Sequence, residues 1–460
     1  MLFNSLDFAI FLPIVFLLYW FVFKNKLKAQ NALIALASYV FYGWWDWRFL
    51  SLILFSTIVD YTIGRLLLAE KEQLKRKVLL WISIAVNLGF LGFFKYYNFF
   101  LDNFISAFSF FGTEINGNSL NIILPVGISF YTFQTLSYTI DVYKKKLKPA
   151  KNFISFAAFV SFFPQLVAGP IERATNLLPQ FYKKRTFVYE KAVDGLRQIL
   201  WGLFKKIVIA DNCAQFANEI FNNSDDYSGS TLILGAIFFT FQIYGDFSGY
   251  SDIAIGTSRL FGFNLKQNFA FPYFSRDIAE FWRRWHISLS TWFRDYLYIP
   301  LGGSRGGMWS KLRNTFIIFI VSGFWHGANW TFIVWGLLNA LFIMPSIILK
   351  TNRNNLETVA KGKILPSIKE LLSILLTFSL TVFAWIFFRA ENIEHAYRYI
   401  NKIVSFSFFS LPNGSELLGA GIHPMIIFLL LGIFILIEWN GREEQYGIAK
   451  FGVKWKSLIR

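Results

Sequence analysis

Cysteine is almost absent from this sequence, and charge is scarce. A single cysteine, Cys213, occurs among 460 residues. One thiol cannot form an intramolecular disulfide or build a thiolate cluster for zinc, so both are excluded. Charged residues make up 16% of the chain, well below the roughly 25% of an ordinary soluble domain. The composition therefore argues against an ordinary soluble protein.

Several catalytic signatures are missing as well. The sequence contains no HExxH motif of a zinc enzyme, no GxSxG nucleophile elbow, no Walker A loop and no GxGxxG fingerprint. We therefore expect no metal site and no tightly bound cofactor. The first apolar run, residues 8–23, has no basic segment before it and no small-residue cleavage site after it. This pattern predicts a retained first span rather than a removed signal peptide.

Apolar residues are what the chain has in abundance, with 55% hydrophobic and 20% aromatic residues. They form repeated runs of about 18 to 25 residues, which match the thickness of a bilayer core. Lysine and arginine cluster in the short loops between these runs, so the net charge of +17 indicates membrane topology rather than nucleic-acid binding. The loops predict about eleven crossings, with the N-terminus outside and the C-terminus in the cytoplasm. The fold class is thus an all-α polytopic membrane protein whose main partner is the lipid bilayer.

Two segments depart from simple spans. Residues 153–168 are apolar but have basic loops at both ends, which predicts a re-entrant piece buried by protein. Residues 257–313 form a long, weakly apolar, arginine-rich stretch, interpreted as a helical insert on the cytoplasmic side. The insert leads into an apolar hairpin, residues 315–349, which is hinged at residues 323–329. We treat residues 1–460 as a single transmembrane domain.

Two of the four histidines, His286 and His326, lie among tryptophans in the insert and the hairpin. A titratable imidazole is costly to keep in a membrane, so it marks a functional-site hypothesis. Residues three or four apart share a helix face, which predicts that Trp282, His286 and Ser290 lie together on one continuous helix. Gly327, directly after His326, permits a helix break or the close approach of a ligand. The alternative for each histidine is a structural role, in which the buried ring only bonds a backbone carbonyl. Two such rings, each beside a helix break indicated by Gly or Pro, make a purely structural role for both less favoured.

Acyl transfer to a hydroxyl is the chemistry that two imidazoles fit best. One ring takes the proton of the hydroxyl as general base, and the other donates a hydrogen bond to the acyl oxygen. His326 and His286 are the predicted catalytic residues, and the pattern leaves open which of them is the base. The predicted substrate- and donor-binding residues are Trp282, Trp285, Ser290, Arg283, Arg284, Arg305, Trp325 and Asn329.

Other ionisable residues allow simpler interpretations. Arg305 lies in the loop GGSRGG, where a solvated turn is the alternative to a donor site. Asp246 and Asp252 lie in an apolar run and need partners, for which a basic residue of the insert is the candidate. His395 and His423 lie in polar or span-edge contexts and are expected to be structural.

Five stretches carry a resemblance: MLFNSLDFAIFLPIVFLLYW, SFFPQLVAGPIERA, QIYGDFSGYSDIAIG, FWRRWHISLSTWFRDYLYIPLGGSR and FWHGANWTFIVWG. In them the chain resembles the membrane-bound O-acyltransferase (MBOAT) superfamily, and within it the alginate O-acetyltransferase membrane subunit group. The resemblance implies a ring of helices around a central tunnel in a bacterial cytoplasmic membrane. It also implies that His326 is the family histidine. His286 matches a second polar position, which is His, Asn or Asp in different branches.

The same resemblance implies an activity. It is O-acetyl transfer from a cytoplasmic thioester, acetyl-CoA, to a hydroxyl of an extracytoplasmic polysaccharide. Transfer is direct or passes through a secreted or membrane-anchored SGNH-hydrolase-like partner, alongside the polysaccharide synthesis and export machinery. One alternative is D-alanyl transfer to teichoic acid, which shares the WHG histidine. The other is a proton-coupled transporter or flippase, but the inverted repeats that such proteins carry are not seen. The acceptor and the acyl donor stay open.

Overall fold

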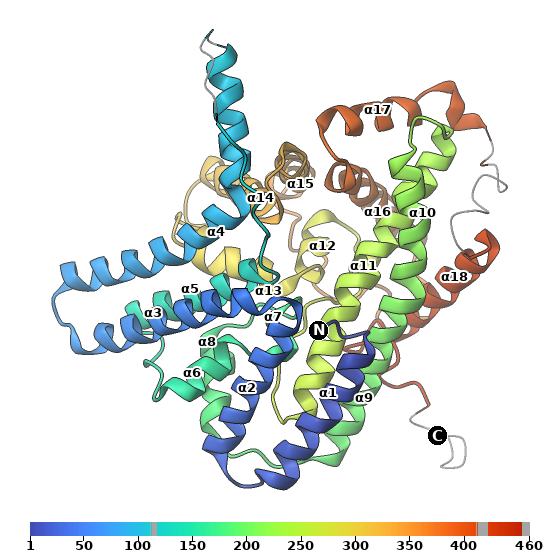
Figure 1. Cartoon of the computed structure of the whole chain (residues 1–460). Helices are drawn as coiled ribbons and strands as arrows, with labels where there is room; N and C mark the ends of the chain where they lie inside the picture. Colours follow the sequence, from blue (N-terminus) through green and yellow to red (C-terminus); the bar gives the residue numbers. More distant parts are fainter. Residues whose placement is uncertain (111, 113–116, 411, 413–421, 453–460) are drawn as a thin grey trace. The chain divides into compact units, whose positions relative to one another are not determined.

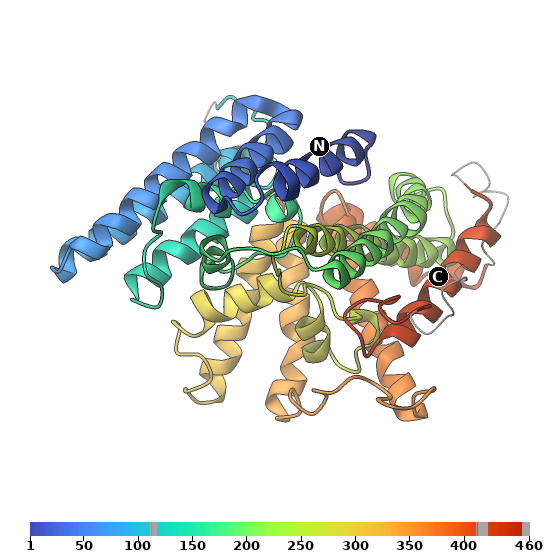
Figure 2. The same cartoon turned by 90° about the horizontal axis from the view of Figure 1, so that it is seen from below.

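The protein is described by a computed structural model covering residues 1–460 except 111, 113–116, 411, 413–421 and 453–460. Every regular element among the described residues is a helix (Figure 1 and Figure 2). The prediction of an all-α protein is therefore confirmed. The chain divides into two compact units, one of residues 1–192 and 257–266 and the other of residues 193–256 and 267–460.

The first unit contains the N-terminal helices. They are α1 (Leu6–Leu17), η1 (Leu18–Val22), α2 (Leu27–Asp46), η2 (Trp47–Phe49), α3 (Leu50–Ala69), α4 (Gln73–Phe110), α5 (Ile128–Tyr143), α6 (Phe153–Val160), α7 (Phe163–Leu166), α8 (Ala174–Leu177) and η3 (Leu178–Tyr182). Helix α4 continues past residue 95 as far as Phe110. The helix persists because the chain meets neither proline nor glycine between residue 95 and Gly112.

The apolar run of residues 153–168 is broken into the short helices α6 and α7. The break falls at Ser161 and Phe162, and both residues are fully buried. Helices α2, α3 and η3 pack against this segment. Protein therefore covers the irregular backbone of this segment, as a re-entrant piece would require, and its course relative to the membrane stays a prediction.

The second unit contains the remaining helices. They are α9 (Tyr189–Leu203), η4 (Phe204–Ala210), α10 (Asp211–Asn222), α11 (Gly229–Leu260), η5 (Pro272–Phe274), α12 (Ile278–Arg284), α13 (Ile287–Phe293), η6 (Arg294–Tyr298), α14 (Met308–His326), α15 (Trp330–Ile348), α16 (Ile368–Arg389), α17 (Ile393–Ile403), η7 (Phe406–Phe409) and α18 (Pro424–Gly441). Its core is strongly aromatic and includes the buried side chains of Trp201, Phe281, Trp285, Trp335 and Trp385.

Helices α14 and α15 form a tight hairpin and lie side by side in both views (Figure 1 and Figure 2). Glycines make the close approach possible. A Cβ atom on Gly323 would lie 2.2 Å from the carbonyl oxygen of Phe332, and one on Gly336 would lie 2.3 Å from that of Phe319. Any side chain at either position would therefore force the two helices apart.

Six helical stretches are long and apolar enough to cross a membrane: Leu27–Ala69, Gln73–Phe110, Gly229–Leu260, Trp330–Ile348, Ile368–Arg389 and Pro424–Gly441. Two shorter apolar stretches, Leu6–Val22 and Phe153–Leu166, accompany them. The prediction of a polytopic membrane protein is confirmed. The total of about eleven crossings, the ring of helices and its tunnel stay predictions.

Candidate functional site

The helix around His286 is broken, not continuous. Helix α12 ends at Arg284, α13 begins at Ile287, and His286 between them has a left-handed backbone with φ of 43° and ψ of 55°. The predicted continuous helix from residue 282 to 293 is therefore wrong. The reason is tertiary: the Ala270 N–H bonds the Arg284 carbonyl, and the Asn268 carbonyl accepts from the Ile287 N–H. These contacts compensate for the interrupted helix.

His286 is 1% exposed. Its Nδ1 lies 3.1 Å from Oδ1 of Asn268. The ring of Phe247 meets the imidazole edge-on at 4.6 Å between centroids, and that of Trp325 lies 6.2 Å away. The other ring nitrogen, Nε2, is buried and has no hydrogen-bond partner among the described residues. A buried polar atom without a partner is rare in folded proteins and requires an explanation.

His326 is the last residue of α14 and is half-buried. Its imidazole lies edge-on to Trp325, Trp335 and Phe388, with centroid distances of 4.9, 5.1 and 5.2 Å. Trp325 thus contacts both histidine rings. Burial lowers the pKa of His286 well below its ordinary value of 6.5, and the charge of His326 lowers it further. Because Trp325 contacts both rings, we treat the two histidines as one candidate site.

A cavity of about 150 Å³ opens between α12, α13 and α14. Its lining residues are Trp282, Leu289, Ser290, Phe293, Ile318, Phe319 and Ser322. Trp282 and Ser290 were both predicted to bind substrate. The Trp282 ring also packs against Trp335, which contacts His326. The cavity is therefore separated from the His326 imidazole by a layer of indole rings.

Two predicted binding residues have structural roles in this arrangement. Trp285 is 3% exposed and packs against Phe281 and Trp385 in the aromatic core. Asn329 caps helix α15, because its Oδ1 accepts from the Thr331 N–H at 3.0 Å, and its Nδ2 donates to the Glu391 carbonyl at 2.7 Å. These contacts account for both side chains without a substrate.

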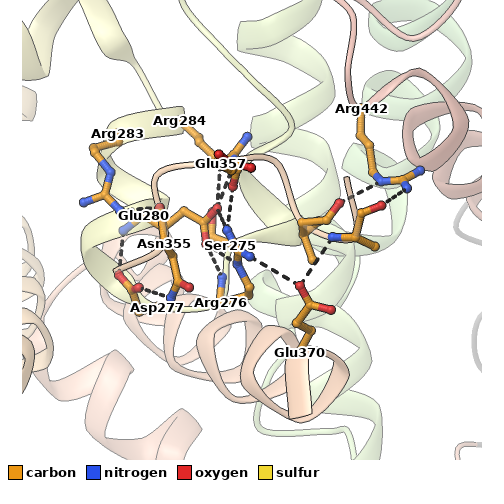
Figure 3. Close-up of polar contacts among 12 residues, drawn as sticks. Ser275, Arg276, Asp277, Glu280, Arg283, Arg284, Asn355, Glu357, Glu370 and Arg442 are labelled. Atoms are coloured by element: carbon orange, nitrogen blue, oxygen red, sulfur yellow. Dashed lines mark hydrogen bonds and ion pairs between the residues drawn. The ribbon is translucent and has the colours of Figure 1, made fainter. Parts of the chain in front are cut away.

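Arg283 and Arg284 were predicted to bind an anionic donor. Both donate hydrogen bonds to the loop between α15 and α16 (Figure 3). Arg283 donates to the carbonyls of Asn352 and Asn355, each at 2.8 Å. Arg284 donates to the carbonyl of Glu357 at 3.2 Å. The guanidinium groups therefore satisfy backbone oxygens of residues 350–367, a segment without helix in its middle.

Glu280 lies at the centre of this arginine clamp, which we define as Arg276, Glu280, Arg283, Arg284 and the loop carbonyls they bond (Figure 3). Its carboxylate is 1% exposed and accepts from Arg276 and Arg284 at 2.9 to 3.0 Å. Arg276 also reaches Glu370 of α16 at 3.3 Å. A buried carboxylate needs this kind of pairing to stay charged.

Arg305 differs from these arginines. Its side chain is exposed and makes no hydrogen bond or ion pair with the part of the chain that the structure describes. Among the predicted donor-binding arginines, it is the one whose guanidinium group has no hydrogen-bond or ion-pair partner in the described part of the chain. Donor binding at Arg305 stays a prediction.

The two carboxylates of α11, of which Asp252 is buried and Asp246 is partly exposed, have partners that the sequence did not indicate. Lys205 bonds Asp252 and Lys206 bonds Asp246, each at 2.6 Å. Both lysines lie in the π-helical turn η4 and not in the 257–313 insert, so the predicted source of the cation is wrong. The extra residue in a π-helical turn places both lysines toward α11, a shift that apolar periodicity does not reveal.

Asn268 is the one site residue that sequence reasoning missed. It is fully buried and contacts His286, Ser288 and Ser251. It lies in an irregular stretch after α11 and belongs to no recognisable motif. Only the fold brings it beside His286.

Comparisons with known proteins identify the family of the chain. The model of the MBOAT, membrane-bound O-acyltransferase family matches residues 144–387, which include both histidines. The chain is 40% identical to the probable alginate O-acetylase AlgI of Azotobacter vinelandii, over 97% of the chain and 86% of the relative. It is 38% identical to the peptidoglycan O-acetyltransferase of Helicobacter pylori, over 89% and 81%. The teichoic acid D-alanyltransferase of Bacillus subtilis is more distant, at 29% identity over 60% of the chain and 71% of the relative.

The family match covers more than half of the chain, and the alginate relatives cover nearly all of it. Six candidate spans accompany the match, and every regular element in the described part of the chain is a helix. The chain is thus a multi-pass membrane acyltransferase and belongs to the membrane-bound O-acyltransferase (MBOAT) family.

Proposed function

We propose that this protein transfers an acetyl group from a cytoplasmic thioester, acetyl-CoA, to a hydroxyl of an extracytoplasmic polysaccharide. The observation that carries the proposal is the level of identity to two kinds of polysaccharide O-acetyltransferase. It is 38 to 40% over 89 to 97% of the chain, against 29% over 60% for a D-alanyltransferase.

The chemistry requires one proton acceptor and one hydrogen-bond donor. The acceptor hydroxyl loses its proton to a neutral imidazole as its oxygen attacks the thioester carbonyl carbon. A hydrogen bond from the other imidazole stabilises the negative charge that grows on the carbonyl oxygen. The carbon–sulfur bond then breaks and the proton passes to the leaving thiolate, so an ester and a thiol are the products. We assign these two roles to His286 and His326.

The chain's surroundings follow from the same proposal. The protein would lie in the bacterial cytoplasmic membrane, with its N-terminus outside and its C-terminus in the cytoplasm. The acetyl group would reach the polysaccharide directly or through a secreted or membrane-anchored SGNH-hydrolase-like protein that works with the synthesis and export machinery. Arg305, exposed in the loop before α14, offers its charge to the phosphates of the donor.

Replacing the main catalytic residue tests the proposal. His326→Ala should abolish acetylation of the surface polysaccharide, measured as ester-bound acetate released by mild base, while the protein stays in the membrane. The matched control is His395→Ala, because His395 bonds Ser224 and lies outside the site. Full acetylation in the His326→Ala strain would overturn the proposed mechanism. Ester-bound D-alanine in place of acetate would favour the D-alanyl alternative.

A further inference from the structure

We infer that a second cavity, between helices α11, α16 and α18 and the turn η5, binds a neutral alcohol from the bilayer. The ligand would have an apolar body and one hydroxyl group, which bonds the carboxyl group of Glu438. The cavity has a volume of about 310 Å³, within the range of roughly 300 to 1,000 Å³ that small-molecule sites occupy. It lies wholly in the second unit, and the inference is independent of the acyl transfer proposed above.

The walls of this cavity are almost entirely apolar. Phe241 of α11, Phe378 of α16 and Phe434 of α18 each contribute a ring to the lining. Leu375 and Ile435 also line the cavity, and both are exposed side chains of candidate spans. Exposed apolar side chains on a spanning helix contact lipid tails, which are as apolar as leucine. The cavity therefore opens toward the bilayer, and its ligand would enter from there.

Glu438 is the one acidic or basic residue in this lining. It is 3% exposed, and its Oε2 accepts a hydrogen bond of 2.5 Å from the Tyr244 hydroxyl. The nearby Lys205 is already engaged, because its ammonium group bonds Asp252 at 2.6 Å and Ser248 at 2.9 Å. An ionisable group at membrane depth is costly and ordinarily has a charged or polar partner. In the part of the chain that the structure describes, Glu438 has no cation as an ion-pair partner.

A hydrogen-bond donor beside Glu438 is also unpaired. The indole N–H of Trp201 lies close to the Glu438 carboxyl group, yet it forms no hydrogen bond with the described residues. A buried donor without a partner is rare and requires an explanation. The surroundings of Glu438 therefore retain hydrogen-bonding capacity that the described chain does not use.

The charge of Glu438 restricts the head group of the ligand. A phosphate or carboxylate head group would be repelled by a charged carboxyl group. An ammonium head group would lose its hydration in an apolar cavity, which costs far more free energy than the same transfer of a hydroxyl. A hydroxyl can both donate and accept, so it can bond a carboxyl group in either protonation state. A neutral alcohol therefore fits the cavity best.

This cavity is separate from the histidine site. The Tyr244 ring in its wall packs against Trp285, with 6.0 Å between the ring centroids. Trp285 contacts Trp385, and Trp385 contacts Trp335. Only Trp335, the last of these three indoles, contacts the His326 ring. A ligand in the cavity would thus bind behind the aromatic core and not at the imidazoles.

Photocrosslinking to a long-chain alcohol tests the inference. The probe is hexadecanol with a diazirine in its chain, added to the full-length protein in phosphatidylcholine nanodiscs, and mass spectrometry locates the labelled peptides. Labels should lie on α11, α16 and α18 beside the cavity. Unlabelled hexadecanol should compete about 5-fold better than hexadecane at equal mole fraction, the ratio expected for one added hydrogen bond. It should also compete better than hexadecylamine and hexadecanoate.

Two results of this experiment would overturn the inference. Equal competition by hexadecanol and hexadecane would mean that the cavity holds lipid chains without recognising a head group. Labels spread over the lipid-facing surface, with none concentrated at the cavity, would mean that the alcohol has no site there.

Two isoleucines of α18 provide a matched pair of variants. Ile435 lines the cavity and is 38% exposed, whereas Ile433 is 41% exposed and lies outside the lining. Ile435→Trp should narrow the opening and remove most of the labelling that hexadecanol competes away. Ile433→Trp adds the same bulk and should leave that labelling unchanged. Undiminished labelling in Ile435→Trp, or an equal loss in both variants, would contradict the site.

The contact with the head group has a test of its own. Glu438→Leu combined with Tyr244→Phe removes both partners of their hydrogen bond, so neither is left buried and unpaired. The cavity should still be labelled, but the preference for hexadecanol over hexadecane should disappear. A preference that persists would overturn the role of Glu438. If this double variant does not fold, the isoleucine pair decides the matter alone. No readout here measures acetylation, so failure leaves the proposed function to the His326→Ala experiment.

Discussion

The arginine clamp and the histidine pair lie in the same unit. The buried carboxylate of the clamp has several hydrogen-bond donors, whereas a buried ring nitrogen at the histidine site has no partner among the described residues. In the clamp, Glu280 accepts from two guanidinium groups and the arginines bond loop carbonyls. At the histidine site, His286 has a left-handed backbone and an Nε2 without a partner among the described residues. Satisfied networks stabilise a fold, whereas strain and an unpaired polar atom in a buried place indicate function.

The first prediction is a substitution that lowers activity and changes stability little. His286→Ala should lower the rate of acetyl transfer by about 10²- to 10⁴-fold, the range expected for loss of an imidazole that takes part in general acid–base catalysis. Its thermal unfolding midpoint in detergent should change little, because the ring makes one hydrogen bond and leaves the other nitrogen unpaired. A large fall in the unfolding midpoint would indicate that His286 has a structural role, like the residues of the clamp, rather than a catalytic one.

The second prediction is a substitution in the arginine clamp whose main effect is a loss of stability. Glu280→Ala leaves Arg276 and Arg284 without their shared carboxylate, and breaking a buried ion pair in this way costs about 3–5 kcal/mol. The loop of residues 350–367 should then become sensitive to protease at a lower temperature. Lys361→Ala is a suitable control, since its bond to Glu357 is exposed on both sides. Equal protease resistance in the two variants would contradict the role assigned to the clamp.

The third prediction concerns the glycine beside His326. A Cβ on Gly327 would lie 2.0 Å from the ring of Phe332, so Gly327→Ala must displace that ring or the helix end. We expect a loss of about 1–3 kcal/mol, typical of overpacking, together with reduced activity because His326 moves. Gly432→Ala in α18 meets nothing within 4 Å and serves as the matched control. The difference between the two unfolding midpoints is the measurement.

The fourth and smallest effect is on stability at low pH. The folded pKa of His286 lies well below its ordinary value of 6.5, so the unfolded chain binds a proton that the folded site rejects. The free energy of unfolding contributed by this group is intact above pH 6.5 and falls as the pH drops from there toward the folded pKa. His286→Ala should weaken this dependence, as followed by thermal melts across the pH range. An unchanged slope would mean that the ring titrates normally.

The sequence was sufficient for the fold class and the family, and the roles of the two histidines stay predictions. Apolar runs and basic loops require a membrane protein, and an imidazole among tryptophans is conspicuous because it is costly there. It was not sufficient for the local shape. The continuous helix through His286 failed because hydrogen bonds from residues 268–270 outweigh helical spacing. Asn268 was missed because an asparagine in an irregular stretch has no pattern that indicates its partner.

The arginines show why charge alone predicts function poorly. Arg283, Arg284 and Arg305 are equivalent in sequence terms, as cations near the candidate site. The structure engages the first two with loop carbonyls and leaves the third exposed and without a partner in the described chain. Their difference depends on where the loop after α15 returns, which is a property of the folded chain.

The backbone of His286 restricts what evolution can place there. Asparagine and aspartate are the side chains, besides glycine, that enter the left-handed region most readily. The resemblance described above implies that His, Asn or Asp occupies this position in different branches. A φ angle of 43° at this position thus limits which side chains can replace His286. It is compatible with the few polar residues that tolerate a left-handed backbone, and it disfavours the β-branched apolar side chains that are common in a buried site.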